Sequence, residues 1–257
     1  MSQAWIIASG KGGVGKSTVT AALAVALARR QLLTVAVDTD IGLCSLDMML
    51  GLQNKIVFDM IDVANKECKL KYALVPYAAA PALSLLPASQ LGTSADLNAE
   101  LMGKIIRKLK KRFSYVLMDA PAGLERGVTN TLFHADHAML VVTPDDVAIR
   151  DAERVIALLA ANHKPRPMLV VNRVIPELVR SGEMYSPQTV ANTLDVPLLG
   201  FVPEDRAVLT ALNRHHTVMD EDSPARDALL RISERFLGEY VPMPDFERKR
   251  RFFGRRS

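Results

Sequence analysis

Two lysines and four glycines lie close together near the N-terminus. Residues 10–17 read GKGGVGKS and fit the pattern G-x-x-x-x-G-K-[ST]. In this pattern glycines let backbone N–H groups approach phosphate oxygens, because no Cβ stands in the way. We expect Lys16 to contact the β- and γ-phosphates of a nucleotide and the Ser17 hydroxyl to bind Mg²⁺. The predicted nucleotide-binding residues of this loop are Gly10, Lys11, Gly12, Gly13, Val14, Gly15, Lys16, Ser17 and Thr18.

Three aspartates directly follow apolar runs of the chain. Asp38 and Asp40 follow the run 33–37, and Asp119 follows the run 115–118 and precedes the sequence APAG. An acid directly after an apolar strand is an arrangement that holds Mg²⁺, directly or through water. One such acid is more often a solvated strand-end residue, but three at one sheet edge favour a site. The predicted metal ligands are Ser17, Asp38 and Asp119.

Seven short apolar runs alternate with helical patterns along the chain. The predicted strands are residues 4–8, 33–37, 83–86, 115–118, 138–142, 168–171 and 198–202, and the main predicted helices are 17–30, 102–113, 146–162 and 224–240. The strands show little polar alternation, which indicates a sheet covered on both faces. The predicted fold class is α/β: a single P-loop NTPase domain with a mostly parallel twisted sheet and helices on both faces. The glycine-rich loop then joins the first strand to the first helix, which argues against a chance glycine-rich turn.

The composition is typical of a globular protein, with 49% hydrophobic and 23% charged residues among 257. No apolar run is long enough to cross a bilayer, and the N-terminal lysines do not precede an export signal. We therefore expect a cytoplasmic protein in which Cys44 and Cys68 are reduced thiols. His134 and His137 are three residues apart but lack a third ligand, so we do not expect a metal there.

The C-terminal residues 245–257 carry six cations and two acids, which accounts for the whole formal net charge of +4. Two prolines at 242 and 244 precede them, so we predict an ATPase domain at 1–240 and a linker with a basic amphipathic tail at 241–257. Basic residues beside phenylalanines suit an anionic bilayer surface. The predicted membrane-contacting residues are Phe246, Arg248, Lys249, Arg250, Arg251, Phe252 and Phe253.

Two other interpretations of the basic residues stay open. A basic tail can simply remain solvated and keep the protein soluble. Nucleic acid is a possible but less favoured partner, because residues 104–112 contain six cations and no acid. We favour a solvated helix face for that segment, since Ile105, Leu109 and Phe113 form an apolar stripe that would pack against the sheet.

Lys11 is a second lysine inside the loop, and with it residues 11–18 (KGGVGKST) resemble the deviant Walker A motif of the MinD/ParA family of P-loop ATPases. Further segments resemble the MinD branch of that family: DTDIGL at 38–43, LPASQ at 86–90, DAPAG at 119–123 and VPED at 202–205. One departure lies in the first of these regions, switch I, where Cys44-Ser45 stands in place of Arg-Asn. This departure bears on switch I signalling and partner binding more than on ATP binding.

The resemblance implies roles for individual residues. The implied catalytic residues are Lys11, Lys16 and Asp40: Lys11 would contact the partner's phosphates across an ATP-dependent dimer, and Asp40 would position or activate the attacking water. Asp38 and Asp119 would support Mg²⁺. The residues that would frame the adenine are Asn172, Pro203, Glu204 and Asp205.

The resemblance also implies a function. An ATP-bound homodimer would bind the inner face of the cell membrane through its tails, and hydrolysis would release it. One tail is a marginal anchor, whereas two tails gain avidity of roughly 10²–10⁴. The implied role is placement of the division site, with MinC-like and MinE-like proteins as partners. The alternatives are a regulator of flagellar number and a ParA-type DNA-partition ATPase. Iron–sulfur relatives need cluster cysteines, whose spacing Cys44 and Cys68 do not provide.

Overall fold

The apolar runs predicted as strands form one sheet. The computed structural model describes residues 2–90, 98–123 and 126–244, and within these residues the sheet has eight strands. Seven correspond to the predicted runs, with ends that differ by up to three residues. The strands are β1 (Gln3–Ala8), β2 (Thr34–Asp38), β3 (Val75–Pro76), β4 (Leu83–Leu86), β5 (Tyr115–Asp119), β6 (His137–Val142), β7 (Met168–Val174) and β8 (Leu198–Pro203).

The strand order is β3-β4-β2-β5-β1-β6-β7-β8, and all pairs are parallel except β3 with β4. The short antiparallel β3 is the strand that the sequence did not predict. The parallel strands bring the carboxyl ends of β1, β2 and β5 next to one another. Asp38 and Asp119 are paired residues in the register of β2 and β5, so the two acids lie at the same level of the sheet.

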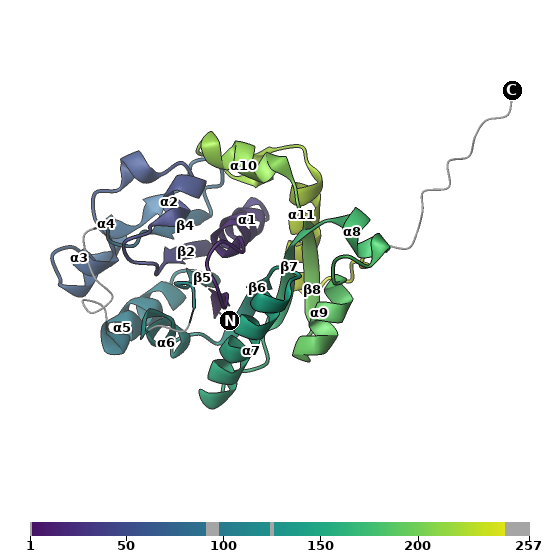
Figure 1. Ribbon diagram of the computed structural model, residues 1–257. Helices are drawn as coiled ribbons and strands as arrows, with labels where there is room; N and C mark the ends of the chain where they lie inside the picture. Colours follow the sequence, from purple (N-terminus) through teal and green to yellow (C-terminus); the bar gives the residue numbers. More distant parts are fainter. Residues whose placement is uncertain (1, 91–97, 124–125, 245–257) are drawn as a thin grey trace, which may run out of the picture.

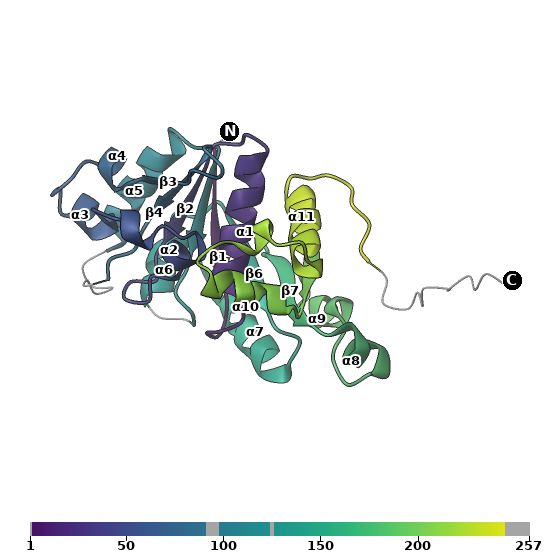
Figure 2. The same ribbon diagram turned by 90° about the horizontal axis from the view of Figure 1, so that it is seen from above.

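Helices cover both faces of the sheet, as predicted (Figure 1). One face is covered by α1 (Lys16–Arg29), α2 (Ser45–Met49), α10 (Arg206–Asn213) and α11 (Pro224–Phe236). The other face is covered by α3 (Met60–Ala64), α4 (Leu70–Ala73), α5 (Ala99–Lys110), α6 (Arg126–Leu132), α7 (Asp146–Ala161) and α9 (Pro187–Leu194). The helix α8 (Pro176–Ser181) follows β7, and Figure 2 shows it beside α9 at one end of the molecule.

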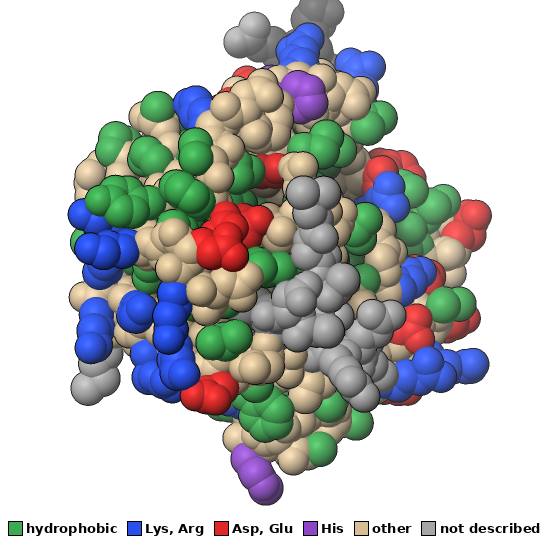
Figure 3. Space-filling model, turned by 90° about the vertical axis from the view of Figure 1, so that its left-hand side faces the viewer, with side chains coloured by type: hydrophobic (Ala, Val, Ile, Leu, Met, Phe, Trp, Pro, Cys, Tyr) green, Lys and Arg blue, Asp and Glu red, His purple; other side chains and the backbone are tan. Residues whose placement is uncertain are grey.

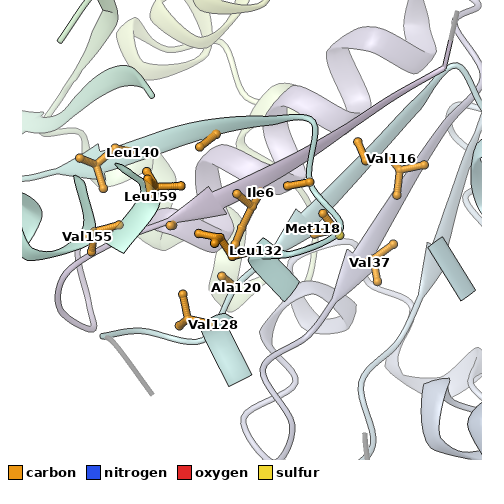
Figure 4. Close-up of a cluster of buried hydrophobic side chains, with 14 of the residues drawn as sticks. Ile6, Val37, Val116, Met118, Ala120, Val128, Leu132, Leu140, Val155 and Leu159 are labelled. Carbon is orange, nitrogen blue, oxygen red and sulfur yellow. The ribbon is translucent and has the colours of Figure 1, made fainter. Parts of the chain in front are cut away.

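Two hydrophobic cores result, one on each face. In the core that contains α5 and α7, alternate residues of the strands point to the same face. Figure 4 shows Ile6, Met118 and Leu140 on this side of the sheet, with side chains of α6 and α7 against them. Both faces of the central strands are buried, which explains why the sequence lacks polar alternation there.

The helix expected over 224–240 ends at Phe236 instead. Gly238 has a positive φ of 86°, the N–H of Gly238 bonds to Arg235 and that of Glu239 to Glu234. This is the hydrogen-bond pattern of a glycine-terminated helix. The predicted membrane residues in the range 245–257 lie outside the described part of the chain.

Candidate functional site

The glycine-rich loop joins β1 to α1 at the carboxyl edge of the sheet. Gly13 and Gly15 have φ values of 78° and 88°, a region that side-chain-bearing residues rarely occupy. A Cβ at Gly15 would lie 2.1 Å from the Nδ2 atom of Asn172, and one at Gly10 would lie 2.4 Å from the backbone carbon of Asp151. Gly13 therefore needs glycine for its backbone conformation, Gly10 needs it for space, and Gly15 needs it for both.

Lys16, at the start of α1, points to Asp119 at the end of β5. Its Nζ lies 2.9 Å from Oδ1 of Asp119, whose side chain is fully buried. The Ser17 hydroxyl donates to Oδ2 of the same carboxylate at 2.6 Å, and the Thr20 hydroxyl donates to Oδ1 at 2.8 Å. The structure thus brings together three residues predicted from the loop and strand motifs. Thr20 was not predicted, although it lies one helical turn after Lys16.

Asp38 is the second buried carboxyl of this site. One of its oxygens accepts a hydrogen bond from the N–H of Asp40 at 3.0 Å and the other from that of Leu46 at 3.1 Å. Burial and the neighbouring Asp119 together raise the pKa of Asp38 to about 7. Asp40 lies just after the carboxyl end of β2 and is partly exposed. The predicted ligands Ser17, Asp38 and Asp119 supply hydroxyl and carboxylate oxygens, the donor set that suits Mg²⁺.

The switch I departure lies beside the predicted metal ligand. Ser45 begins α2, and its hydroxyl donates to the Ser17 hydroxyl oxygen at 3.0 Å. Cys44 is buried with a positive φ of 45°, and burial raises the pKa of its thiol to about 11. Cys44 is therefore an uncharged packing residue, whereas Ser45 connects switch I to the phosphate loop.

Lys11 pairs with Asp145, an acid outside the cluster of Lys16, Ser17 and Asp119. Its Nζ lies 3.1 Å from Oδ1 of Asp145, and about a third of its side chain is exposed. The Thr143 hydroxyl donates to Asp145 at 2.6 Å, and Asp145 also accepts from the N–H of Ala148 as the cap of α7. Asp145 is a further residue that the sequence motifs did not indicate, because it lies 134 positions from Lys11.

The residues predicted to frame the adenine lie at the carboxyl ends of β7 and β8. Asn172 is buried, and its Nδ2 donates to the backbone oxygen of Val14 at 2.7 Å, so it supports the phosphate loop directly. Glu204 follows Pro203 and pairs with Arg173 at 3.1 Å. The Asp205 carboxylate caps α10 and also accepts from the N–H of Ala225. These residues lie at the same edge of the sheet as the phosphate loop. Arg173, which was not predicted, contacts both Glu204 and the backbone oxygen of Gly13 in that loop.

The remaining candidates do not form a site. His134 follows α6 and lies against the Ala99 carbonyl oxygen, whereas His137 begins β6 and stacks on Trp5. Over the described ranges, no group of three or more His, Cys, Asp and Glu side chains could hold a metal ion, and both cysteines are free. No helix in that part of the chain has the length and apolarity to cross a membrane.

Basic side chains gather on the face formed by α3, α4 and α5 (Figure 3). Ile105, Leu109 and Phe113 are buried beneath this face, as predicted. Lys104 pairs with Glu100 and Lys110 pairs with Asp136, so part of the positive charge is offset. The face lies at the opposite end of the sheet from β8.

Comparison with known proteins identifies similar sequences and folds. Residues 5–218 match the CobQ/CobB/MinD/ParA nucleotide binding domain family. The septum site-determining protein MinD of Helicobacter pylori is 44% identical over 254 residues, covering 96% of this chain and 95% of that protein. The protein of the same name from Bacillus subtilis is 39% identical over 269 residues and is covered, like this chain, over 100% of its length.

Solved structures agree with the sequence relatives. A chain of the MinC:MinD cell division protein complex from Aquifex aeolicus matches with a TM-score of 0.89 and 36% identity, over 95% of this chain and 99% of that chain. MinD of Pyrococcus horikoshii, complexed with Mg-ADP, matches with a TM-score of 0.83 and 27% identity, over 92% and 96% of the two chains.

Proposed function

Because the chain belongs to the CobQ/CobB/MinD/ParA family of nucleotide-binding domains, we propose that it is a MinD-like ATPase that controls where the cell divides. The observation that carries this proposal is a complete phosphate loop with the additional lysine Lys11. In this loop Lys16 and Ser17 both contact the buried carboxylate of Asp119. The similarity to septum site-determining proteins over nearly the whole chain supports the cellular role.

The loop residues hold the nucleotide in this proposal. The backbone N–H groups between Gly10 and Ser17 and the positive N-terminal end of α1 attract phosphate oxygens. Lys16 would exchange its contact with Asp119 for the phosphates, and the Ser17 hydroxyl and the two buried aspartates would hold Mg²⁺. Bound Mg²⁺ neutralises phosphate charge when it is present. The MinD of Pyrococcus horikoshii with Mg-ADP supports this assignment.

Hydrolysis uses the acid at the mouth of the site. Asp40 is held in place after β2 because its own N–H bonds to Asp38 and its carbonyl accepts from Leu43 and Cys44. We assign Asp40 to position the attacking water and accept its proton. The buried Asp38 and Asp119 are too enclosed for that role and serve to hold the cation.

Lys11 completes the site of a second copy of the chain. In the single chain its Nζ pairs with Asp145 at 3.1 Å and not with Asp38 or Asp119, the buried acids of the site. Dimerisation after ATP binding would bring Lys11 to the partner's phosphates, so the dimer persists only while the γ-phosphate is present. Two basic tails then act together on an anionic membrane, and hydrolysis lets the protein leave it.

The proposed partners follow from the same relatives. The structure that matches with a TM-score of 0.89 comes from a MinC:MinD complex, which supports a MinC-like partner for this chain. We also propose a MinE-like activator, on the sequence resemblance alone. The proposed location is the cytoplasmic face of the cell membrane.

Light scattering of the purified full-length protein with ADP and with a non-hydrolysable ATP analogue tests the switch. We expect the mass to double with the analogue and not with ADP. Lys11→Gln should stay monomeric with the analogue, whereas the charge-matched control Lys111→Gln should still dimerise. A monomer with both nucleotides would contradict the proposal.

A further inference from the structure

The six residues after Gly238 form an ordered segment that lies along the edge of the sheet. We call residues 239–244 the linker segment. Figure 2 shows it leaving α11 and running toward the end of the described chain, at the opposite end of the molecule from α3 and α4. The segment contains two prolines and has no helix or strand of its own.

Arg235, in the last turn of α11, holds the linker segment in place. Its guanidinium donates to the backbone oxygens of Val241 and Pro242, each at 2.8 Å, and to that of Leu199 at 3.1 Å. Leu199 belongs to β8, the edge strand of the sheet. One side chain therefore ties the segment to the edge strand.

Two other residues make this contact possible. Gly200 leaves space for it, because a Cβ at that position would lie 3.0 Å from Nη1 of Arg235 and 2.5 Å from Cγ1 of Ile232. Glu239, the first residue of the linker segment, pairs with Arg30 at the end of α1. The segment is thus fixed at its start by α1 and at its middle by α11.

The fixed segment presents apolar side chains to solvent. Tyr240 is 94% exposed, the largest value among the exposed large hydrophobic residues of the described chain, and Met243 is 36% exposed. Holding a tyrosine in water beside a packed domain gives the fold no stability. Tyrosine is, however, enriched at membrane–water interfaces, where its ring and hydroxyl meet apolar and polar surroundings together.

The linker segment continues directly into the basic residues. Residues 245–257 begin where the described chain ends, and they carry six cations and two acids. We propose that the linker segment is a second lipid-contacting surface, in which Tyr240 and Met243 enter the headgroup region of an anionic bilayer. Arg235 is its positioning residue. This inference rests on the proposed membrane association and extends it from the tail to the folded domain.

A fixed segment has a consequence for binding. A flexible tether would let the tail reach the bilayer from any orientation of the domain and would lose conformational freedom on binding. The Arg235 contacts remove that freedom beforehand, so each tail leaves its domain from a set point. In a dimer, two such segments would act together on one membrane surface.

Vesicle sedimentation with phosphatidylglycerol-containing liposomes and a non-hydrolysable ATP analogue tests the inference on the full-length protein. Tyr240→Ser is expected to weaken binding about tenfold, the effect of exposing part of one aromatic ring per protomer. The matched control is Tyr72→Ser, which removes another exposed tyrosine at the far end of the molecule. It should bind as the wild type does.

Arg235→Gln tests the positioning role separately. It should weaken vesicle binding more than Arg231→Gln, which removes the same charge from the same helix. Arg235→Gln should also make the bond after Tyr240 more sensitive to chymotrypsin. Nucleotide affinity should not change, because no residue of the nucleotide site contacts Arg235 in the described chain.

A direct signal comes from Tyr240→Trp with brominated lipids. Trp5 is buried, so quenching of the fluorescence reports on residue 240. Quenching supports the lipid contact. Two results would overturn the inference and leave the proposed function standing. One is that Tyr240→Ser binds vesicles with the same affinity as the wild type. The other is that the Tyr240→Trp protein binds vesicles without quenching. Absence of vesicle binding by the wild type with the ATP analogue overturns the proposed function itself.

Discussion

Replacing Asp38 by asparagine is expected to change how the stability of the nucleotide-free protein depends on pH. Burial and Asp119 raise the pKa of Asp38 to about 7 in the folded chain, against about 3.9 for an unfolded aspartate. The folded state therefore holds a proton that the unfolded state has released. The contribution of Asp38 to the free energy of unfolding is therefore fully present below the unfolded pKa. It is lost as the pH rises through 7, the pKa of the folded state.

The size of the effect follows from the two pKa values. Between pH 5 and pH 8, the wild type should lose on the order of 2–3 kcal/mol of unfolding free energy relative to Asp38→Asn. The asparagine amide can accept from only one of the two N–H groups that now bond to Asp38. That loss costs about 1–3 kcal/mol at every pH, so it shifts the two curves apart without changing their relative slope.

Urea unfolding at pH 5, 6, 7 and 8 without nucleotide or Mg²⁺ measures this difference. Asp222→Asn is the control, because the side chain of Asp222 is 94% exposed. Its curve should run parallel to that of the wild type. Saturating Mg-ADP should reduce the difference between Asp38→Asn and the wild type, since a cation next to Asp38 favours the ionised form. If the Asp38→Asn and wild-type curves stayed parallel within about 0.5 kcal/mol, a raised pKa of Asp38 in the folded protein would be refuted.

Three further substitutions test the site. Gly15→Ala should lower ADP affinity at least a hundredfold in calorimetry, because its Cβ would overlap the Nδ2 atom of Asn172 at 2.1 Å and displace the loop; unchanged affinity would show that the loop can move. Lys16→Gln should lower Mg-ADP affinity by about two orders of magnitude and leave Asp119 without its cation, seen as a lower midpoint of urea unfolding. Lys11→Gln should keep ADP affinity within about threefold but abolish the nucleotide-dependent dimer; a large loss of ADP affinity would mean that Lys11 acts within its own chain.

The central sheet and the core of the site could be predicted from the sequence because their signals are local. Strands buried on both faces appear as uninterrupted apolar runs, and an acid at the end of such a run marks the carboxyl edge. Lys16, Ser17 and Asp119 were expected together on this basis, and the structure places them within hydrogen-bonding distance. The family assignment was confirmed by the matching family and relatives.

The remaining contacts depend on residues far apart in the chain. The bond from Asn172 to Val14 spans 158 positions, and the pair of Lys11 with Asp145 spans 134. No spacing rule connects such residues before the sheet order is known. The helices α2, α3 and α4 have only five, five and four residues, too few to show helical periodicity. The bonds from Arg235 to Val241 and Pro242 likewise depend on the path of the linker segment, which no local pattern indicates.

The most direct test of the central claim is the vesicle-bound fraction of the full-length protein, measured by sedimentation with anionic liposomes in ADP and in a non-hydrolysable ATP analogue. The account predicts strong binding with the analogue, weak binding with ADP, and loss of the difference in Lys11→Gln. Equal binding in both nucleotides, or an unchanged difference in Lys11→Gln, would contradict a switch that works through a second copy of the chain.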